Sequence, residues 1–115
     1  MFDGKRDVSR EEVVNKMNYF IESAEKAMEA YQTNKRQCLE LTKSIRDELE
    51  REYKNNSLKR TENFYHDNEW FMHHYRPAVH DAVASIVGRT SYKNMYSFLY
   101  DVVDYMKYHL PKLNK

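Results

Sequence analysis

The chain has 115 residues, of which 41% are apolar and 32% are charged, and its formal net charge is +1 with histidine neutral. The aromatic content of 14% is higher than a disordered chain carries, and the near-zero charge gives no electrostatic bias towards nucleic acid. The single cysteine, Cys38, excludes an internal disulfide. We therefore expect one globular domain over residues 1–115, in a reducing compartment.

Neither glycine nor proline occurs between Gly4 and Pro77, and apolar side chains recur there at helical spacing. Because glycine and proline are the residues that most strongly interrupt helices and strands, their absence predicts long helices. No apolar stretch approaches the roughly 20 residues of a membrane span, and the first residues lack the apolar core of a signal peptide. We expect an all-α, cytoplasmic protein without membrane contact.

The first predicted helix begins after Ser9, which forms a capping-box pattern with Glu12. Side chains suited to a buried seam then follow every three or four residues, with Lys35 and Thr42 as weak members: Met17, Ile21, Ala24, Met28, Tyr31, Lys35, Cys38, Thr42, Ile45 and Leu49. Two structures fit this seam. In the first, a hairpin bends at 33–35 and has helices over 9–33 and 36–55. In the second, one unbroken N-terminal helix forms a rod about 65–70 Å long. We favour the hairpin, because helices of rod length are rare.

The second half predicts further helices with a kink between them. After a break near Ser57, apolar residues fall seven apart at Leu58, Tyr65, Met72 and Val79. Pro77 predicts a kink or a restart, because proline is unfavourable inside a helix and suits a first turn. A last helix is predicted from Thr90 or Ser91 to about Leu110, before Pro111. Together these elements predict an antiparallel bundle of three or four helices.

One pattern suits a metal. Glu62, His66, Glu69 and His73 follow steps of four, three and four, so they share one stripe of the expected helix. Carboxylate and imidazole are ligands of zinc and iron, and helical bundles house di-iron sites. The stripe lies opposite the apolar face, however, and residues 1–60 contain no histidine to complete a site. A solvated polar face is the simpler interpretation, and metal binding is kept as an alternative.

A second pattern suits DNA. Residues 82–99 can form two helices around a tight turn at Gly88, as in a helix-turn-helix. The residues that would then approach a major groove are Arg89, Tyr92, Lys93, Asn94 and Tyr96. Residues 61–115 carry six basic and six acidic side chains, without the basic surplus that phosphate contacts favour. Nucleic-acid binding is therefore an alternative that we do not favour.

The ten tyrosines are the unusual feature of the composition. Tyr100 and Tyr108 fall off the apolar stripe of the last helix, and Trp70 falls off the apolar face of its own helix. Exposed tyrosine and tryptophan are typical of protein interfaces, although tyrosine also serves as a core residue. We interpret these three residues as a candidate binding surface.

Catalytic motifs are lacking. The only glycines, Gly4 and Gly88, cannot build a phosphate-binding loop or a nucleophile elbow. We therefore predict a protein that is not an enzyme and has no cofactor. The expected role is a small protein–protein interaction module: an adaptor, an inhibitor, an immunity-type protein, a subunit of a larger complex or a self-associating protein.

Overall fold

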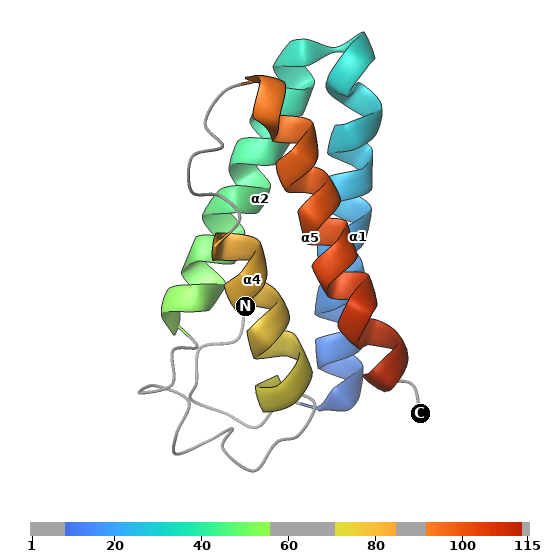
Figure 1. Cartoon of the computed structure of the whole chain (residues 1–115), viewed down its shortest axis with the longest axis vertical. Helices are drawn as coiled ribbons and strands as arrows, with labels where there is room; N and C mark the ends of the chain where they lie inside the picture. Colours follow the sequence, from blue (N-terminus) through green and yellow to red (C-terminus); the bar gives the residue numbers. More distant parts are fainter. Residues whose placement is uncertain (1–8, 56–70, 85–91, 114–115) are drawn as a thin grey trace.

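The protein is built from helices in every part that the structure describes (Figure 1). The computed structural model describes residues 9–55, 71–84 and 92–113. In chain order the elements are α1 (Arg10–Thr33), α2 (Lys35–Asn55), the π-helical turn η1 (Phe71–Tyr75), α4 (Arg76–Ala84) and α5 (Tyr92–Leu113). The described residues contain no strand, which confirms the predicted all-α bundle. None of these helices has the length and apolar character of a membrane-spanning segment.

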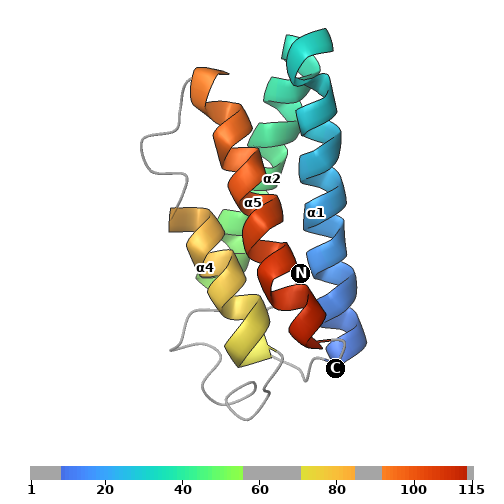
Figure 2. The same ribbon diagram turned by 45° about the vertical axis from the view of Figure 1, so that its right-hand side comes forward.

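The first two helices form an antiparallel hairpin, and its joint is Asn34 (Figures 1 and 2). The backbone N–H of Asn34 donates to the carbonyl of Ala30 at 2.9 Å and closes the last turn of α1. Its side-chain Oδ1 accepts a hydrogen bond from the backbone N–H of Gln37 at 3.1 Å, and its carbonyl accepts one from Cys38 at 3.0 Å. One residue thus ends α1 and begins α2. The predicted bend is confirmed, and the alternative of an unbroken N-terminal rod is wrong.

The start of α1 follows its capping signal. The Ser9 side chain accepts a hydrogen bond from the backbone N–H of Glu12 at 3.1 Å, while the Ser9 backbone is extended at φ −79° and ψ 158°. The bond satisfies an amide that has no partner within the helix, and Glu11 and Glu12 place negative charge near the positive end of the helix dipole. The predicted helix start at Ser9 is confirmed.

The chain changes helix type just before Pro77. Residues Phe71–Tyr75 form a π-helical turn, and α4 begins at Arg76 with Pro77 in its first turn. In an unbroken α-helix the proline ring would collide with the carbonyl four residues earlier, that of His73, and that carbonyl would lose its hydrogen bond. A wider turn before the proline relieves this conflict. The restart predicted at Pro77 is confirmed, and its form is a π-helical turn.

The last helix is longer than the pattern predicts. Pro111 predicts an end near Leu110, whereas α5 continues to Leu113. Proline fixes φ near −65°, which is itself a helical value. Pro111 removes one backbone hydrogen bond and crowds the carbonyl of Lys107, but the final turn still keeps its helical form. The predicted end of the last helix is therefore wrong, because α5 ends about one turn later.

The core lies where α1 packs against both α2 and α5, and α4 packs against α2 and α5 (Figure 2). The predicted seam is buried at Met17, Ile21 and Ala24 on α1 and at Ile45 and Leu49 on α2. Because two helices flank α1, a second set of α1 residues is buried beyond the predicted seam: Val13, Phe20, Ala27 and Ala30. The central position of α1 accounts for this wider buried face.

Candidate functional site

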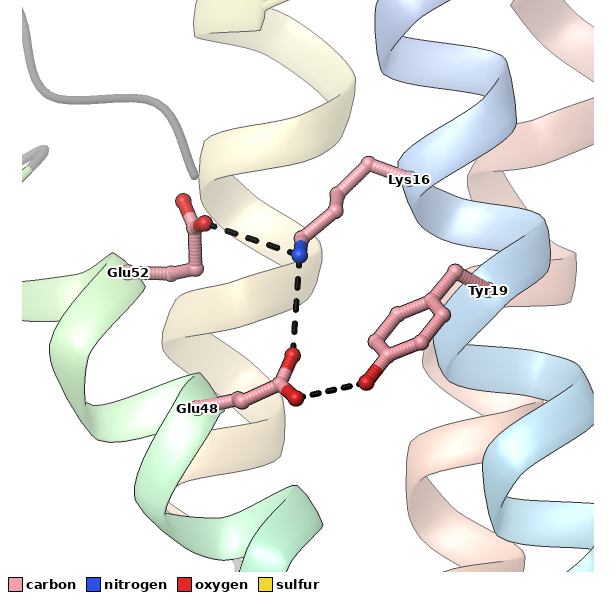
Figure 3. Close-up of polar contacts among 4 residues, drawn as sticks. All are labelled: Lys16, Tyr19, Glu48 and Glu52. Carbon is pink, nitrogen blue, oxygen red and sulfur yellow. Dashed lines mark hydrogen bonds and ion pairs between the residues drawn. The ribbon is translucent and has the colours of Figure 1, made fainter.

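Four polar side chains meet between α1 and α2 (Figure 3). The Lys16 ammonium lies between two carboxylates, 3.5 Å from Oε2 of Glu48 and 4.0 Å from Oε1 of Glu52. The hydroxyl of Tyr19 donates a hydrogen bond to Oε1 of Glu48. We call these four residues, with the neighbouring Tyr75, the polar cluster.

The spacing of the polar cluster follows from the hairpin. Lys16 and Tyr19 are three apart on α1, and Glu48 and Glu52 are four apart on α2, so each pair lies on one side of its helix. Because the two helices are antiparallel, Lys16 lies opposite Glu52 and Tyr19 lies opposite Glu48 (Figure 3). The turn at Asn34 therefore determines which side chains meet.

The cluster extends into the core at Tyr75. Tyr75 is fully buried and Glu52 is only 1% exposed. Burial raises the pKa of Tyr75 well above its usual value, and the charge of Glu52, a hydrogen bond to Glu52 and the charge of Glu48 raise that pKa further. The phenol of Tyr75 is therefore neutral at physiological pH and does not act as a nucleophile or a base.

The geometry of the polar cluster suits a structural clamp. Lys16 already occupies the position between Glu48 and Glu52 that a bound cation would take. Any slip of α1 along α2 would separate the ammonium from both carboxylates, and buried charges are costly without a partner. Within the described ranges, no group of three or more His, Cys, Asp or Glu is placed to hold a metal ion. We infer that the cluster sets the register of the hairpin.

Tyr75 should make the stability of the protein depend on pH in alkaline solution. Its pKa is raised in the folded state, so above about pH 10 the unfolded chain releases the phenolic proton while the folded chain keeps it. The contribution of Tyr75 is thus fully present below the unfolded-state pKa and is lost as the pH rises towards the folded-state pKa. The expected slope is about −1.4 kcal/mol of unfolding free energy per pH unit, measured by urea unfolding.

The matched variants for this slope are Tyr75→Phe and Tyr100→Phe. Tyr75→Phe removes the buried phenol and should flatten the alkaline decline by this amount. Tyr100→Phe removes an exposed phenol and should leave the decline unchanged. Identical declines in the wild type and in Tyr75→Phe would contradict the burial of this hydroxyl.

A second feature is a row of exposed tyrosines on α5, which we call the tyrosine face: Tyr96, Tyr100 and Tyr108. Their side chains are 42%, 56% and 64% exposed, and spacings of four and eight residues keep them on one side of the helix. Tyr100 and Tyr108 are exposed, as their positions off the apolar stripe predict. Trp70, the third predicted interface residue, lies outside the described residues.

The tyrosine face borders a shallow recess between the end of α1 and the start of α5. Met28, Tyr31, Tyr96 and Ser97 are among its lining residues. The rings of Tyr31 and Tyr96 pack edge to face, with centroids 5.2 Å apart and an interplanar angle of 63°. Tyr96 is therefore held against α1, whereas Tyr100 and Tyr108 are the more exposed members of the face.

The structure covers the helix-turn-helix hypothesis only in part. Arg89 and the proposed turn lie outside the described residues. Tyr92, Lys93 and Asn94 begin α5, but their side chains also lie outside the described part. Tyr96 is exposed and packs against a tyrosine of α1. Nucleic-acid binding remains a prediction that none of these observations favours.

The predicted metal stripe is likewise covered in part. Glu62, His66 and Glu69 lie outside the described residues. His73 lies on η1 and its side chain is exposed. Because η1 is a π-helical turn, the α-helical periodicity behind the stripe does not hold at His73.

A histidine pair that the sequence patterns do not reveal joins η1 to α5. The Nδ1 atoms of His74 and His109 are 3.2 Å apart, and the two rings meet edge to face with centroids 5.4 Å apart. The ring of Tyr108 packs edge-on against His109, with centroids 4.9 Å apart. The two histidines are 35 positions apart in the chain, so only the packing of η1 on α5 brings them together.

Cys38 belongs to the core. Its side chain is fully buried, and Sγ lies 3.5 Å from the Met95 sulfur on α5. Burial raises the pKa of the Cys38 thiol, with a smaller opposing effect from a hydrogen bond to Thr42. A buried, protonated thiol is a poor nucleophile, so Cys38 acts here as a small hydrophobic residue.

These features define the class of the protein: an all-α bundle with a partly buried polar cluster and an exposed tyrosine face. Comparison with known proteins finds no matching family model, no matching curated protein and no matching solved structure.

Proposed function

We propose that this chain is a protein–protein interaction module that binds its partner through the tyrosine face of α5. The observation that carries the proposal is the exposure of Tyr100 and Tyr108, which exceeds that of every other large hydrophobic residue whose side chain the structure describes. Both residues lie on a regular helix whose opposite side is buried, so neither is needed to complete the core.

Tyrosine suits this role for a physical reason. Its ring contributes a large apolar contact area, its hydroxyl can bond a partner, and only two side-chain torsions are ordered on binding. Tyrosine is accordingly enriched among the residues that dominate binding energy at interfaces. Two such rings on one helix face form a candidate anchor for a partner surface.

Charged side chains surround these rings. Asp104 is exposed between Tyr100 and Tyr108, and Lys107 forms a 3.6 Å ion pair with Glu25 of α1. The two rings and these charges together form a mixed apolar and polar surface, and protein interfaces combine both kinds of contact. The roles that fit such a surface are an adaptor, an inhibitor, an immunity-type protein, a subunit of a larger complex or a self-associating protein, acting without a cofactor and without catalysis.

The double variant Tyr100→Ser/Tyr108→Ser tests the proposal. Both side chains are exposed, so we expect each substitution to change the unfolding free energy by at most about 0.5 kcal/mol. Association should weaken by about 30-fold, because loss of one interface anchor costs roughly 2 kcal/mol or more. Sedimentation velocity over a concentration series measures self-association, and urea unfolding measures stability.

Photo-crosslinking in the native cells extends the test to other partners. A benzophenone side chain at position 100 or 108 should give covalent protein adducts, and these should disappear when the other tyrosine is replaced by serine. Tyr53 on α2 is 43% exposed and provides the control position. No self-association together with no adducts, or equal adducts from all three positions, would refute the proposed surface.

A further inference from the structure

We propose that His74 of η1 and His109 of α5 chelate a divalent transition-metal ion of the zinc and copper class. This site adjoins the tyrosine face, because the ring of Tyr108 packs against His109, but it uses none of the tyrosines as a ligand. It also differs from the sequence-predicted stripe in both of its residues. The proposal is carried by the approach of the two Nδ1 atoms to 3.2 Å. Imidazole nitrogen is a preferred ligand of Zn²⁺, Cu²⁺ and Ni²⁺.

The separation of the two nitrogens fits a shared metal ion. Zinc binds histidine nitrogen at about 2.0–2.1 Å, so two ligands of one ion stand about 3.0 Å apart at a right angle and about 3.4 Å apart at a tetrahedral angle. The observed Nδ1–Nδ1 distance of 3.2 Å lies between these limits. An ion could therefore bind both histidines with little movement of η1 relative to α5.

The same two atoms form a hydrogen bond when the protein is metal-free. One Nδ1 then donates its hydrogen and the other accepts it through its lone pair. On metal binding, the donor imidazole places its hydrogen on Nε2, and both Nδ1 lone pairs bind the ion. When both imidazoles are neutral, the metal ion thus replaces the hydrogen shared between the two Nδ1 atoms. That hydrogen stays on the protein at Nε2, so no proton is released.

Packing holds both ligands in place. Tyr75, which follows His74 directly, is fully buried, and Met106, one helical turn before His109, is also fully buried. Both imidazoles are themselves partly buried. Such preorganisation lowers the entropic cost of chelation. The π-helical turn that carries His74 is a local irregularity of a kind often found at functional sites.

The two histidines would supply part of the coordination shell. No cluster of three or more potential ligands occurs among the residues that the structure describes, so water completes the shell in the simplest form of the site. Because the ligands come from two separate helical elements, the bound ion would cross-link η1 to α5. Metal binding should therefore stabilise the folded state against unfolding.

Zinc titration of the protein without an affinity tag tests the proposal. We expect Zn²⁺ to raise the melting temperature of the wild type and to bind in a one-to-one ratio by calorimetry. The variants His74→Gln and His109→Gln should each bind zinc at least tenfold more weakly, since even loss of an outer-shell partner costs about 10–100-fold. Glutamine retains hydrogen-bonding groups, and the melting temperature without zinc verifies that each variant folds.

Two exposed histidines provide matched controls. His73→Gln on η1 and His80→Gln on α4 should retain the zinc affinity of the wild type. The electron paramagnetic resonance spectrum of bound Cu²⁺ should show coupling to two imidazole nitrogens, reduced to one in either ligand variant. A zinc response that is absent in the wild type, or that is lost equally in His73→Gln, would overturn the proposal and leave the pair as a hydrogen bond only.

Discussion

Replacing Tyr75 with alanine is expected to lower the free energy of unfolding by about 3–5 kcal/mol, the range for truncation of a large buried aromatic side chain. The ring is fully buried where η1 meets α4, so its loss leaves a cavity in the core. Small domains have total stabilities of about 5–15 kcal/mol, and this change would remove a large share of that total. Urea unfolding followed by circular dichroism measures the effect.

Two further tyrosine variants separate the contribution of the buried Tyr75 ring from that of its hydroxyl and from that of an exposed tyrosine ring. Tyr75→Phe keeps the ring and removes only the hydroxyl, so a smaller loss of about 1 kcal/mol is expected. Tyr100→Ala truncates an exposed ring and should change the stability by at most about 0.5 kcal/mol. Equal losses for Tyr75→Ala and Tyr100→Ala would show that Tyr75 does not fill the core.

Replacing Lys16 with methionine is expected to destabilise the protein by about 2–3 kcal/mol at neutral pH. Lys16 is the cation shared by Glu48 and Glu52, so its removal leaves two carboxylates facing each other with one positive charge fewer. Breaking a fully buried ion pair costs roughly 3–5 kcal/mol, but the side chains of Lys16 and Glu48 are 21% and 22% exposed, and water lowers the cost here. Methionine retains the apolar stem, so the loss reports mainly on the charge.

Lys26→Met is the matched control for this charge. Lys26 is an exposed lysine of the same helix, and its replacement should change the stability by at most about 0.5 kcal/mol. Adding Glu48→Gln to Lys16→Met should recover part of the lost stability, because it removes one of the two facing carboxylates. A Lys16→Met variant as stable as Lys26→Met would mean that the polar cluster does not stabilise the hairpin.

Much of the fold was predictable from local patterns. The buried stripe on α2 is confirmed at Cys38, Thr42, Ile45 and Leu49, because a packed helix must turn every third or fourth side chain towards its neighbour. The bend at Asn34 was predictable in position only. Its form, one residue that ends one helix and begins the next, depends on a side-chain hydrogen bond to Gln37.

The candidate sites were predictable to different degrees. The exposure of Tyr100 and Tyr108 follows from their positions off the apolar stripe. The burial of Glu52 was also predictable, because this residue continues the buried stripe after Ile45 and Leu49. A charged residue on such a stripe indicates a buried polar contact. Its partner Lys16 could not be identified, since that pairing depends on the register across the hairpin.

The amino-acid sequence by itself determined the helices, their approximate limits and most of their buried faces, because helix formation and amphipathic periodicity act over a few neighbouring residues. Only the tertiary structure decided which polar groups meet. Lys16 lies between two carboxylates of α2, and His74 meets His109, because helices distant in sequence pack in one particular register. The π-helical turn before Pro77 changes the side-chain register just ahead of α4, and no regular α-helical period can anticipate that shift.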